Sequence, residues 1–368
     1  MKQLLLLLVL VGILIVPAQA AESDTVQSFR DSARQSIVSG LDGEAQRMVG
    51  DLSLEDCTDI TQIAERISAY CRRQSGDALK TTLVMLSKVM VILILCSCVA
   101  GFPSGAGSSP MFLTMAGALG MTAVVSSDLM SLMSLCRSTA EELSVLSASM
   151  LPVVMTAVSL CGAAATGVML FAGTEFAFHL CVSLITGVLL PMVSAYIAMI
   201  TVNAALGNGI LTRLADFLRW VIHSTLKLLL SAFIGYITVF GAVTRSTDAA
   251  AVRAAKFALS GTVPVVGSIL SNAAETVLSS ASVVKNTVGV FGMLCVVAVC
   301  LLPFLRLGLS YLLFRAGSAV LSPICPASLL GLMDGLTRSF GLILGMLGSC
   351  CMILFFELAY AVIFITSV

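Results

Sequence analysis

From Thr81 to the C-terminus the sequence is a succession of apolar stretches, each long enough to cross a bilayer. A crossing helix needs about 20 predominantly apolar residues, and the helix satisfies its own backbone hydrogen bonds in lipid. We therefore predict an all-α, polytopic transmembrane helical bundle of seven or eight spans. The candidate spans are residues 82–101, 111–127, 148–170, 177–202, 228–244, 286–305, 307–330 and 340–366.

The composition excludes the main soluble classes. Of the 368 residues, 58% are hydrophobic and only 11% are charged, too few charges to cover the surface of soluble domains. The formal net charge is zero, so the chain lacks the basic excess that typifies nucleic-acid-binding proteins. We expect lipid, and no nucleic acid, among its partners.

The N-terminus has the pattern of a secretory signal. Residues 1–20 contain a lysine, an apolar run and a small-residue site ending at Ala20, which predicts cleavage after that residue. A retained membrane anchor is the alternative, but the apolar run is short for a span. Residues 21–80 would then form a small exported segment, and residues 81–368 the membrane domain.

Two amphipathic helices are predicted in the exported segment. One carries its apolar face on Val26, Phe29, Ala33, Ile37 and Leu41, and the other begins after Asp59. We expect the two stripes to pack on each other; docking on the membrane surface or on a partner are the alternatives. Cys57 and Cys71 would lie about 20 Å apart on a continuous helix, too far for a disulfide.

The remaining ten cysteines fall mostly in apolar runs without the spacing of a metal site, so we interpret them as small packing residues. They include Cys96, Cys98, Cys295, Cys300, Cys350 and Cys351.

Two basic clusters flank the predicted span 228–244. Arg213, Arg219 and Lys227 precede it, and Arg245, Arg253 and Lys256 follow it. Because basic residues favour the cytoplasmic side, a single crossing cannot satisfy both clusters. Either 228–244 is a re-entrant hairpin or one cluster lies outside.

Residues 255–289 form a helix pattern that is half apolar and half uncharged-polar. Such a stripe suits a water-filled lumen or contacts between helices, and packing or an interfacial location explains it equally well. The residues that we assign to a lumen or subunit contact are Ser268, Asn272, Glu275, Thr276, Ser280, Lys285 and Asn286.

Chemistry is otherwise sparse. Glu357 stands alone in the last apolar segment, where an intramembrane carboxylate is a functional candidate, although a neutral, hydrogen-bonded interior role fits as well. Glu175 and His179 lie four residues apart on one helix face and could exchange a proton, but a solvated pair at a span boundary is favoured. Phosphate-loop, zinc-protease and nucleophile-elbow motifs are absent, and we expect no catalytic residue, cofactor or metal.

One ordered string of residues resembles a known family. Ala255-Lys256-Phe257, Pro264-Val265-Val266-Gly267, Thr276-Val277 and the run from Lys285 to Gly292 are similar to the centre of the stage III sporulation protein AE family. The order of signal, exported segment and spans is similar too.

The resemblance implies a non-enzymatic subunit of a channel-like, secretion-like complex in the mother-cell membrane around the forespore, needed for late forespore gene expression. Expected partners are the other membrane proteins and the ATPase of that complex, with a forespore protein across the intermembrane space. A stand-alone small-molecule permease is the main alternative; an intramembrane enzyme would need a convergent polar site.

Overall fold

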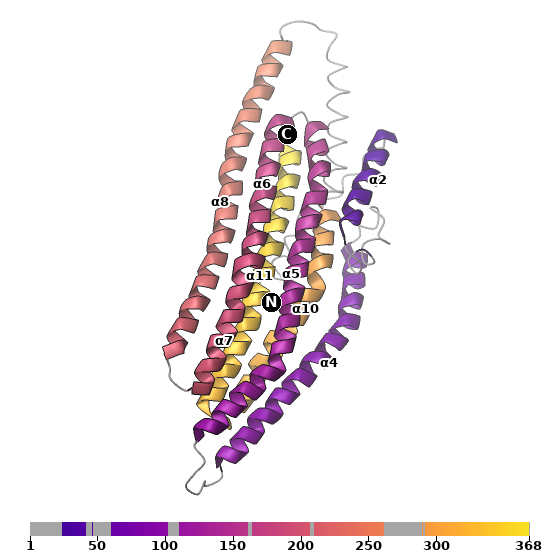
Figure 1. The fold of residues 1–368 in the computed structure, drawn as a ribbon. Helices are drawn as coiled ribbons and strands as arrows, with labels where there is room; N and C mark the ends of the chain where they lie inside the picture. Colours follow the sequence, from indigo (N-terminus) through magenta and orange to yellow (C-terminus); the bar gives the residue numbers. More distant parts are fainter. Residues whose placement is uncertain are drawn as a thin grey trace.

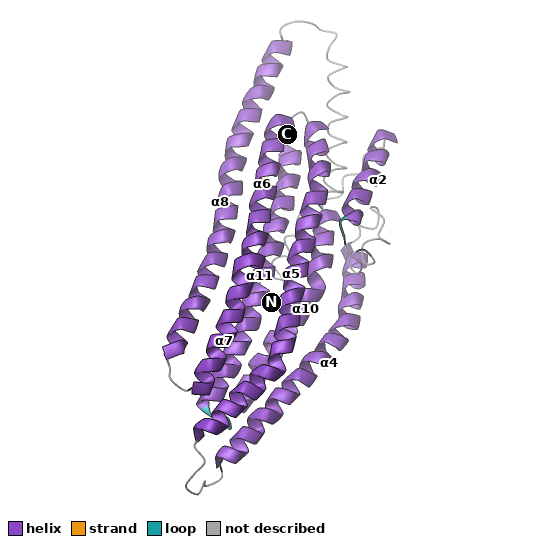
Figure 2. Ribbon diagram, in the orientation of Figure 1, coloured by secondary structure: helices purple, strands orange, loops and turns teal. Residues whose placement is uncertain are grey.

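The computed structural model describes residues 24–41, 46, 60–101, 110–160, 164–206, 210–260, 289 and 291–367. These residues form helices joined by short turns, without a strand among them (Figure 2). In chain order the helices are α2 (Asp24–Ser39), α4 (Ile60–Gly101), α5 (Pro110–Leu160), α6 (Ala164–Leu184), the π-helical turn η2 (Ile185–Leu189), α7 (Leu190–Leu206), α8 (Ile210–Ser260), α10 (Gly292–Leu321) and α11 (Ala327–Ser367).

Six helical segments of the described chain are long and apolar enough to cross a membrane, which confirms the predicted all-α, multi-pass class. They run side by side in one elongated bundle (Figure 1). The segments are Ala78–Val99, Phe112–Thr156, Phe171–Leu206, Leu211–Val239, Gly292–Leu321 and Ala327–Ile363.

The predicted count of seven or eight spans is wrong for the described residues, because two of the predicted breaks between spans, at residues 128–147 and at Arg306, lie inside α5 and α10. Residues 128–147, which we took as a connection between spans 111–127 and 148–170, continue α5. Their polar residues alternate with a buried stripe at helical spacing, and that stripe keeps the helix packed on its neighbours. The stripe is formed by Leu129, Met133, Cys136, Ala140, Leu143 and Leu146.

The sequence predicts a break between spans 286–305 and 307–330 at Arg306, but Arg306 lies inside α10. Its side chain is exposed, so a single long cation is accommodated at the helix surface without a break.

Helix α8 decides between the two alternatives for residues 228–244. It continues through both basic clusters as one helix of 51 residues, so the re-entrant hairpin is wrong. The clusters lie toward opposite ends of this helix, about 60 Å apart from Arg213 to Arg253 at the rise of an α-helix. One cluster is therefore held on the non-cytoplasmic side if α8 crosses the bilayer.

Helix α11 supplies the centre of the bundle, between α5, α7, α8 and α10. In its most apolar window 61% of the residues are buried, compared with 17% in α8, which lies at the edge. Its interior side chains include Leu336, Phe340, Ile343, Met346, Leu347, Cys350, Ile353 and Leu354.

In the part of the chain that the structure describes, the two helices predicted for residues 21–80 do not pack mainly on each other, contrary to expectation. In α2 the predicted face is buried at Ala33, Ile37 and Leu41, but it lies against α5, where Gly40 meets Ser149. The helix predicted after Asp59 begins at Ile60 as expected and continues directly into the first span as α4. Because α4 runs on into the membrane bundle, the long α5 offers the nearest apolar surface to α2.

A disulfide joins Cys300 of α10 to Cys351 of α11, with their Cα atoms 7.0 Å apart. This pairing corrects the interpretation of these two cysteines as separate packing residues. Sequence spacing could not reveal it, because 51 positions separate them and only the α10–α11 contact brings them together. Cys295 and Cys350 are buried in the core, as predicted, whereas Cys98 is exposed.

Candidate functional site

The predicted polar stripe lies outside the described residues, so its role in a lumen or subunit contact stays a prediction. This holds for Ser268, Asn272, Glu275, Thr276, Ser280, Lys285 and Asn286. Of the wider segment 255–289, residues 255–260 form the end of α8.

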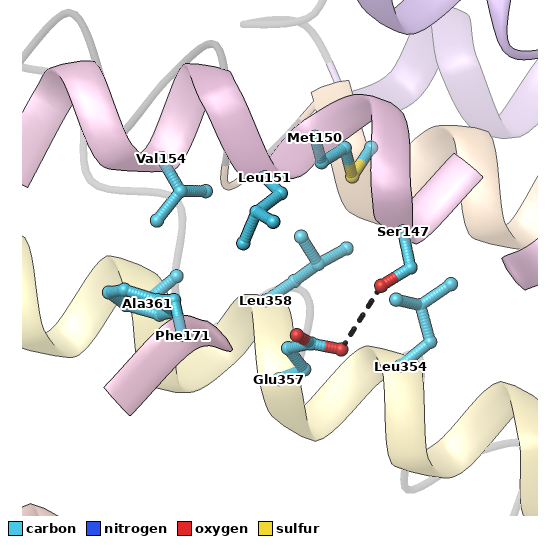
Figure 3. A pocket seen from close by; sticks show the side chains of 9 residues that line it. All are labelled: Ser147, Met150, Leu151, Val154, Phe171, Leu354, Glu357, Leu358 and Ala361. Carbon is cyan, nitrogen blue, oxygen red and sulfur yellow. Dashed lines mark hydrogen bonds between the residues drawn. The ribbon is translucent and has the colours of Figure 1, made fainter. Parts of the chain in front are cut away.

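Glu357 is the predicted site residue that the structure describes. It follows 18 uncharged residues of α11, from Ser339 to Phe356, and its side chain is 7% exposed. The buried face of α11 points this carboxyl toward α5 and α6, together with Leu354, Leu358 and Ala361 (Figure 3). The functional candidate is thus an interior group.

Two hydroxyls from neighbouring helices bind this carboxyl. Thr174 of α6, which is fully buried, donates to Oε1 of Glu357 at 2.9 Å. Ser147 of α5 lies 3.3 Å from Oε2 (Figure 3). A buried carboxyl needs such partners because the loss of water is otherwise uncompensated. Glu357 is therefore a buried, hydrogen-bonded group, and its functional role stays a prediction.

Ser147 also contacts a second carboxyl, since its Oγ lies within hydrogen-bond distance of Oε2 of Glu175 on α6. Glu175 and Glu357 thus face the same hydroxyl from two different helices. Side chains of three helices converge here, although 28 and 210 residues separate Ser147 from the two acids.

The prediction that Glu175 and His179 form a solvated pair is wrong for Glu175. His179 is exposed, and its Nδ1 lies 3.2 Å from Oγ of Ser144. Glu175 is half-buried and turned inward to Ser147. The helical repeat correctly places the two residues on one face of α6, but α5 then binds each of them separately.

A small cavity lies beside Glu357. Its free volume is about 10 Å³, which is the room that about one water molecule occupies. Apart from the carboxyl and Ser147 its walls are apolar: Met150, Leu151, Val154, Phe171, Leu354, Leu358 and Ala361 (Figure 3). An organic solute would not fit in this space.

Sequence reasoning missed Ser147 and Thr174. A signal was present for Ser147, which lies at the spacing of Leu143, Met150 and Val154 and so occupies a core position of α5. A polar residue at such a position requires a partner. Its partners could not be deduced, because they come from α6 and α11.

A second polar group lies nearer the other end of the bundle. Arg338 of α11 hydrogen-bonds Tyr196 of α7, close to Asp216 and Arg219 of α8. From Arg338 to Glu357 the rise of α11 is about 28 Å, which matches the thickness of the hydrocarbon core. The two polar groups are therefore well separated along the bundle, and uncharged residues from Leu358 to Ile365 continue α11 beyond Glu357.

The same end holds a short network between α10 and α11. Asp334 accepts a hydrogen bond of 2.5 Å from Ser318 and pairs with Arg315 at 3.9 Å. Within the described residues, no three His, Cys, Asp or Glu side chains gather closely enough to hold a metal ion.

The comparison with known proteins agrees with the resemblance. The family model of stage III sporulation protein AE matches residues 44–366. Among curated proteins, stage III sporulation protein AE of Bacillus subtilis (strain 168) is 27% identical over 156 residues, 42% of this chain and 39% of that protein. The matched part thus spans about two fifths of this relative. No solved structure matches the chain.

Proposed function

Because the chain belongs to the stage III sporulation protein AE family, we propose that it is a non-enzymatic membrane subunit of a channel-like complex connecting mother cell and forespore. In this role it would sit in the mother-cell membrane around the forespore and be required for late forespore gene expression. The observation that carries the proposal is the extent of the family match, because residues 44–366 include all six candidate spans.

The partners follow from the family resemblance. We expect the chain to assemble with the other membrane proteins of the same complex and with its ATPase, which would supply energy. A forespore protein across the intermembrane space would complete the connection. The sequence has no phosphate-binding loop, which is consistent with energy coming from a partner.

The arrangement of helix ends supports one orientation. The end of α4, the end of α7, the start of α8 and the turn from α10 to α11 lie at the same end of the bundle (Figure 1). Four basic side chains lie toward that end, Arg213, Arg219, Arg315 and Arg338, against the two acids Asp216 and Asp334. The predicted export of residues 21–80 puts the end with α2 outside the cytoplasm, so we propose that the end with these four basic side chains is cytoplasmic and that Arg245, Arg253 and Lys256 are tolerated on the outer side.

We assign residues 255–289 to a polar passage or a subunit contact on the outer side. The assignment rests on the sequence stripe and on the position of α8, whose C-terminal end lies at the end of the bundle opposite to the turn from α10 to α11. Single cysteines at Ser39, Ser246 and Ser282 in a cysteine-free chain test it. Labelling of Ser282→Cys by small aqueous reagents but not by bulky ones supports a passage; inertness to every aqueous reagent contradicts it.

A stand-alone permease is the rival function, and the cavity beside Glu357 speaks against this position as its substrate site. A volume of about 10 Å³ holds no organic solute. Reconstitution of the purified chain alone in liposomes separates the two functions. Solute flux without partners would favour the permease, whereas the proposed subunit conducts nothing by itself.

Deletion and complementation in a spore-forming host test the role directly. Loss of the chain should abolish heat-resistant spores and a late forespore reporter, and an affinity-tagged copy should restore both and co-purify the ATPase and membrane partners. Normal sporulation without the chain, or full complementation by a tagged copy that purifies alone, would overturn the proposal.

A further inference from the structure

Around Ser147, the carboxylate oxygens of Glu175 and Glu357 outnumber the hydroxyl protons that Ser147 and Thr174 can donate to them. Ser147 has one hydroxyl proton, yet its Oγ lies within hydrogen-bond distance of Oε2 of Glu175 and of Oε2 of Glu357. If both carboxyls were ionised, one of the two contacts would set oxygen lone pairs against each other. The contact is balanced when one carboxyl carries a proton and donates it to Ser147, which then donates its own to the other.

Thr174 does not remove this imbalance. Its single hydroxyl proton is directed to Oε1 of Glu357 or to the carbonyl oxygen of Phe171, both at 2.9 Å. It therefore satisfies at most one further oxygen of Glu357 and leaves the shared Ser147 contact as it was.

We propose that Glu175, Ser147 and Glu357 form a proton-dependent latch between α5, α6 and α11. The three helices stay joined while the two carboxyls share a proton, and the contact weakens when both are ionised, because like charges then face each other across one hydroxyl. This inference goes beyond the proposed sporulation role and holds for the isolated chain.

The surroundings allow a proton to reach the latch. Exposure decreases from His179, at the surface, through half-buried Glu175 to Glu357, which is 7% exposed. His179 is close enough to act on the charge of Glu175. The cavity of about 10 Å³ beside Glu357 has room for about one water molecule, which would let the carboxyl oxygens move apart.

The titratable groups that face the latch are few in the described part of the chain. Besides Glu175 and His179 from α6, Tyr236 of α8 is near enough to interact with the charge of Glu357. Helix α10 approaches through Gly292, which contacts Met150 and Leu358. Among the described residues, Glu175 is therefore the charged group that acts on Glu357, and no cation offsets it.

Infrared spectroscopy of the purified full-length chain in lipid nanodiscs tests the shared proton. At neutral pH the wild type should show the carbonyl stretch of a protonated carboxyl, and this band should disappear at alkaline pH. Glu357→Gln should abolish the neutral-pH band, whereas in Glu175→Gln the band should disappear at a lower pH than in the wild type, because the like charge that opposes ionisation of Glu357 is gone. Glu141→Gln removes an exposed acid of α5 and should leave the band intact.

Thermal unfolding against pH tests the latch itself. The unfolding midpoint of the wild type and of Glu141→Gln should fall from neutral to alkaline pH, and Glu175→Gln should show a smaller fall. Absence of a Glu357-dependent band at neutral pH, or an equal fall in Glu175→Gln, overturns the proposal. If Glu357→Gln does not fold, Ser147→Ala provides the second readout: it retains both carboxyls, and a band that neither shifts nor weakens in it also overturns the latch.

Discussion

The hydroxyl of Tyr236 on α8 lies directly against Gly173 on α6, so close that a Cβ atom added at Gly173 would collide with it. The contact joins α8, the most exposed of the six candidate spans, to the helix that carries Thr174 and Glu175. Because Gly173 has no side chain, α8 can pack beside the helix that carries Glu175.

Gly173→Ala should destabilise the bundle by separating α8 from α6. Overpacking of this kind costs about 1–3 kcal/mol, which exceeds the gain of about 1 kcal/mol that alanine brings to a helix. The midpoint of thermal unfolding, followed by circular dichroism in detergent, should fall. Gly308→Ala is the matched control, because nothing lies within 4 Å of the added atom.

A second substitution makes the Gly173 prediction specific. Tyr236→Phe removes the colliding oxygen, so Gly173→Ala should cost less in the Tyr236→Phe background than in the wild type. Equal costs in both backgrounds would mean that Tyr236 is not the group that alanine displaces.

Thr174→Val should weaken the α6–α11 contact. The change keeps the shape of a fully buried side chain but removes the hydroxyl that donates to Glu357, and an unpaired buried acceptor costs about 1–3 kcal/mol. The unfolding midpoint should fall accordingly. Thr238→Val, at an exposed position of α8, removes a hydroxyl that bonds its own helix and should change the midpoint little; equal falls would contradict the buried contact.

The Cys300–Cys351 disulfide predicts a defined count of alkylated thiols. In denaturant without reductant, these two cysteines should resist alkylation, and reduction should expose them, as measured by intact mass. The variant with both Cys300→Ser and Cys351→Ser should gain two fewer labels on reduction than the wild type. An unchanged gain would show that the pair is not bonded.

Cys325, in the turn between α10 and α11, should react slowly with alkylating reagents. Burial raises the pKa of its thiol, and the neighbouring Cys96 raises that pKa further. A raised pKa means less thiolate at a given pH, so alkylation should accelerate only at a higher pH than for a cysteine in a short peptide. Peptide mass spectrometry after timed iodoacetamide treatment gives the rate; a pH profile equal to that of the peptide contradicts the prediction.

Much of the fold could be predicted because its determinants are local. Apolar length identified the membrane helices, and a 3.6-residue period identified the buried face of α2 at Ala33 and Ile37. The same reasoning fails for residues 128–147, whose polar composition predicts a connection between spans although their apolar stripe continues α5. The charge pattern alone also does not decide whether residues 228–244 form a single span or a re-entrant hairpin. The continuous backbone of α8 excludes the hairpin.

By itself the sequence determined the class, a multi-pass helical membrane protein, and it drew attention to Glu357 as a carboxyl within an apolar helix. Only the tertiary structure decided what that carboxyl meets. Its partners Ser147 and Thr174 lie 210 and 183 residues away, and Cys300 finds Cys351 across 51 positions. Periodicity reports which face of a helix is buried, whereas the packing of separate helices determines which buried faces touch.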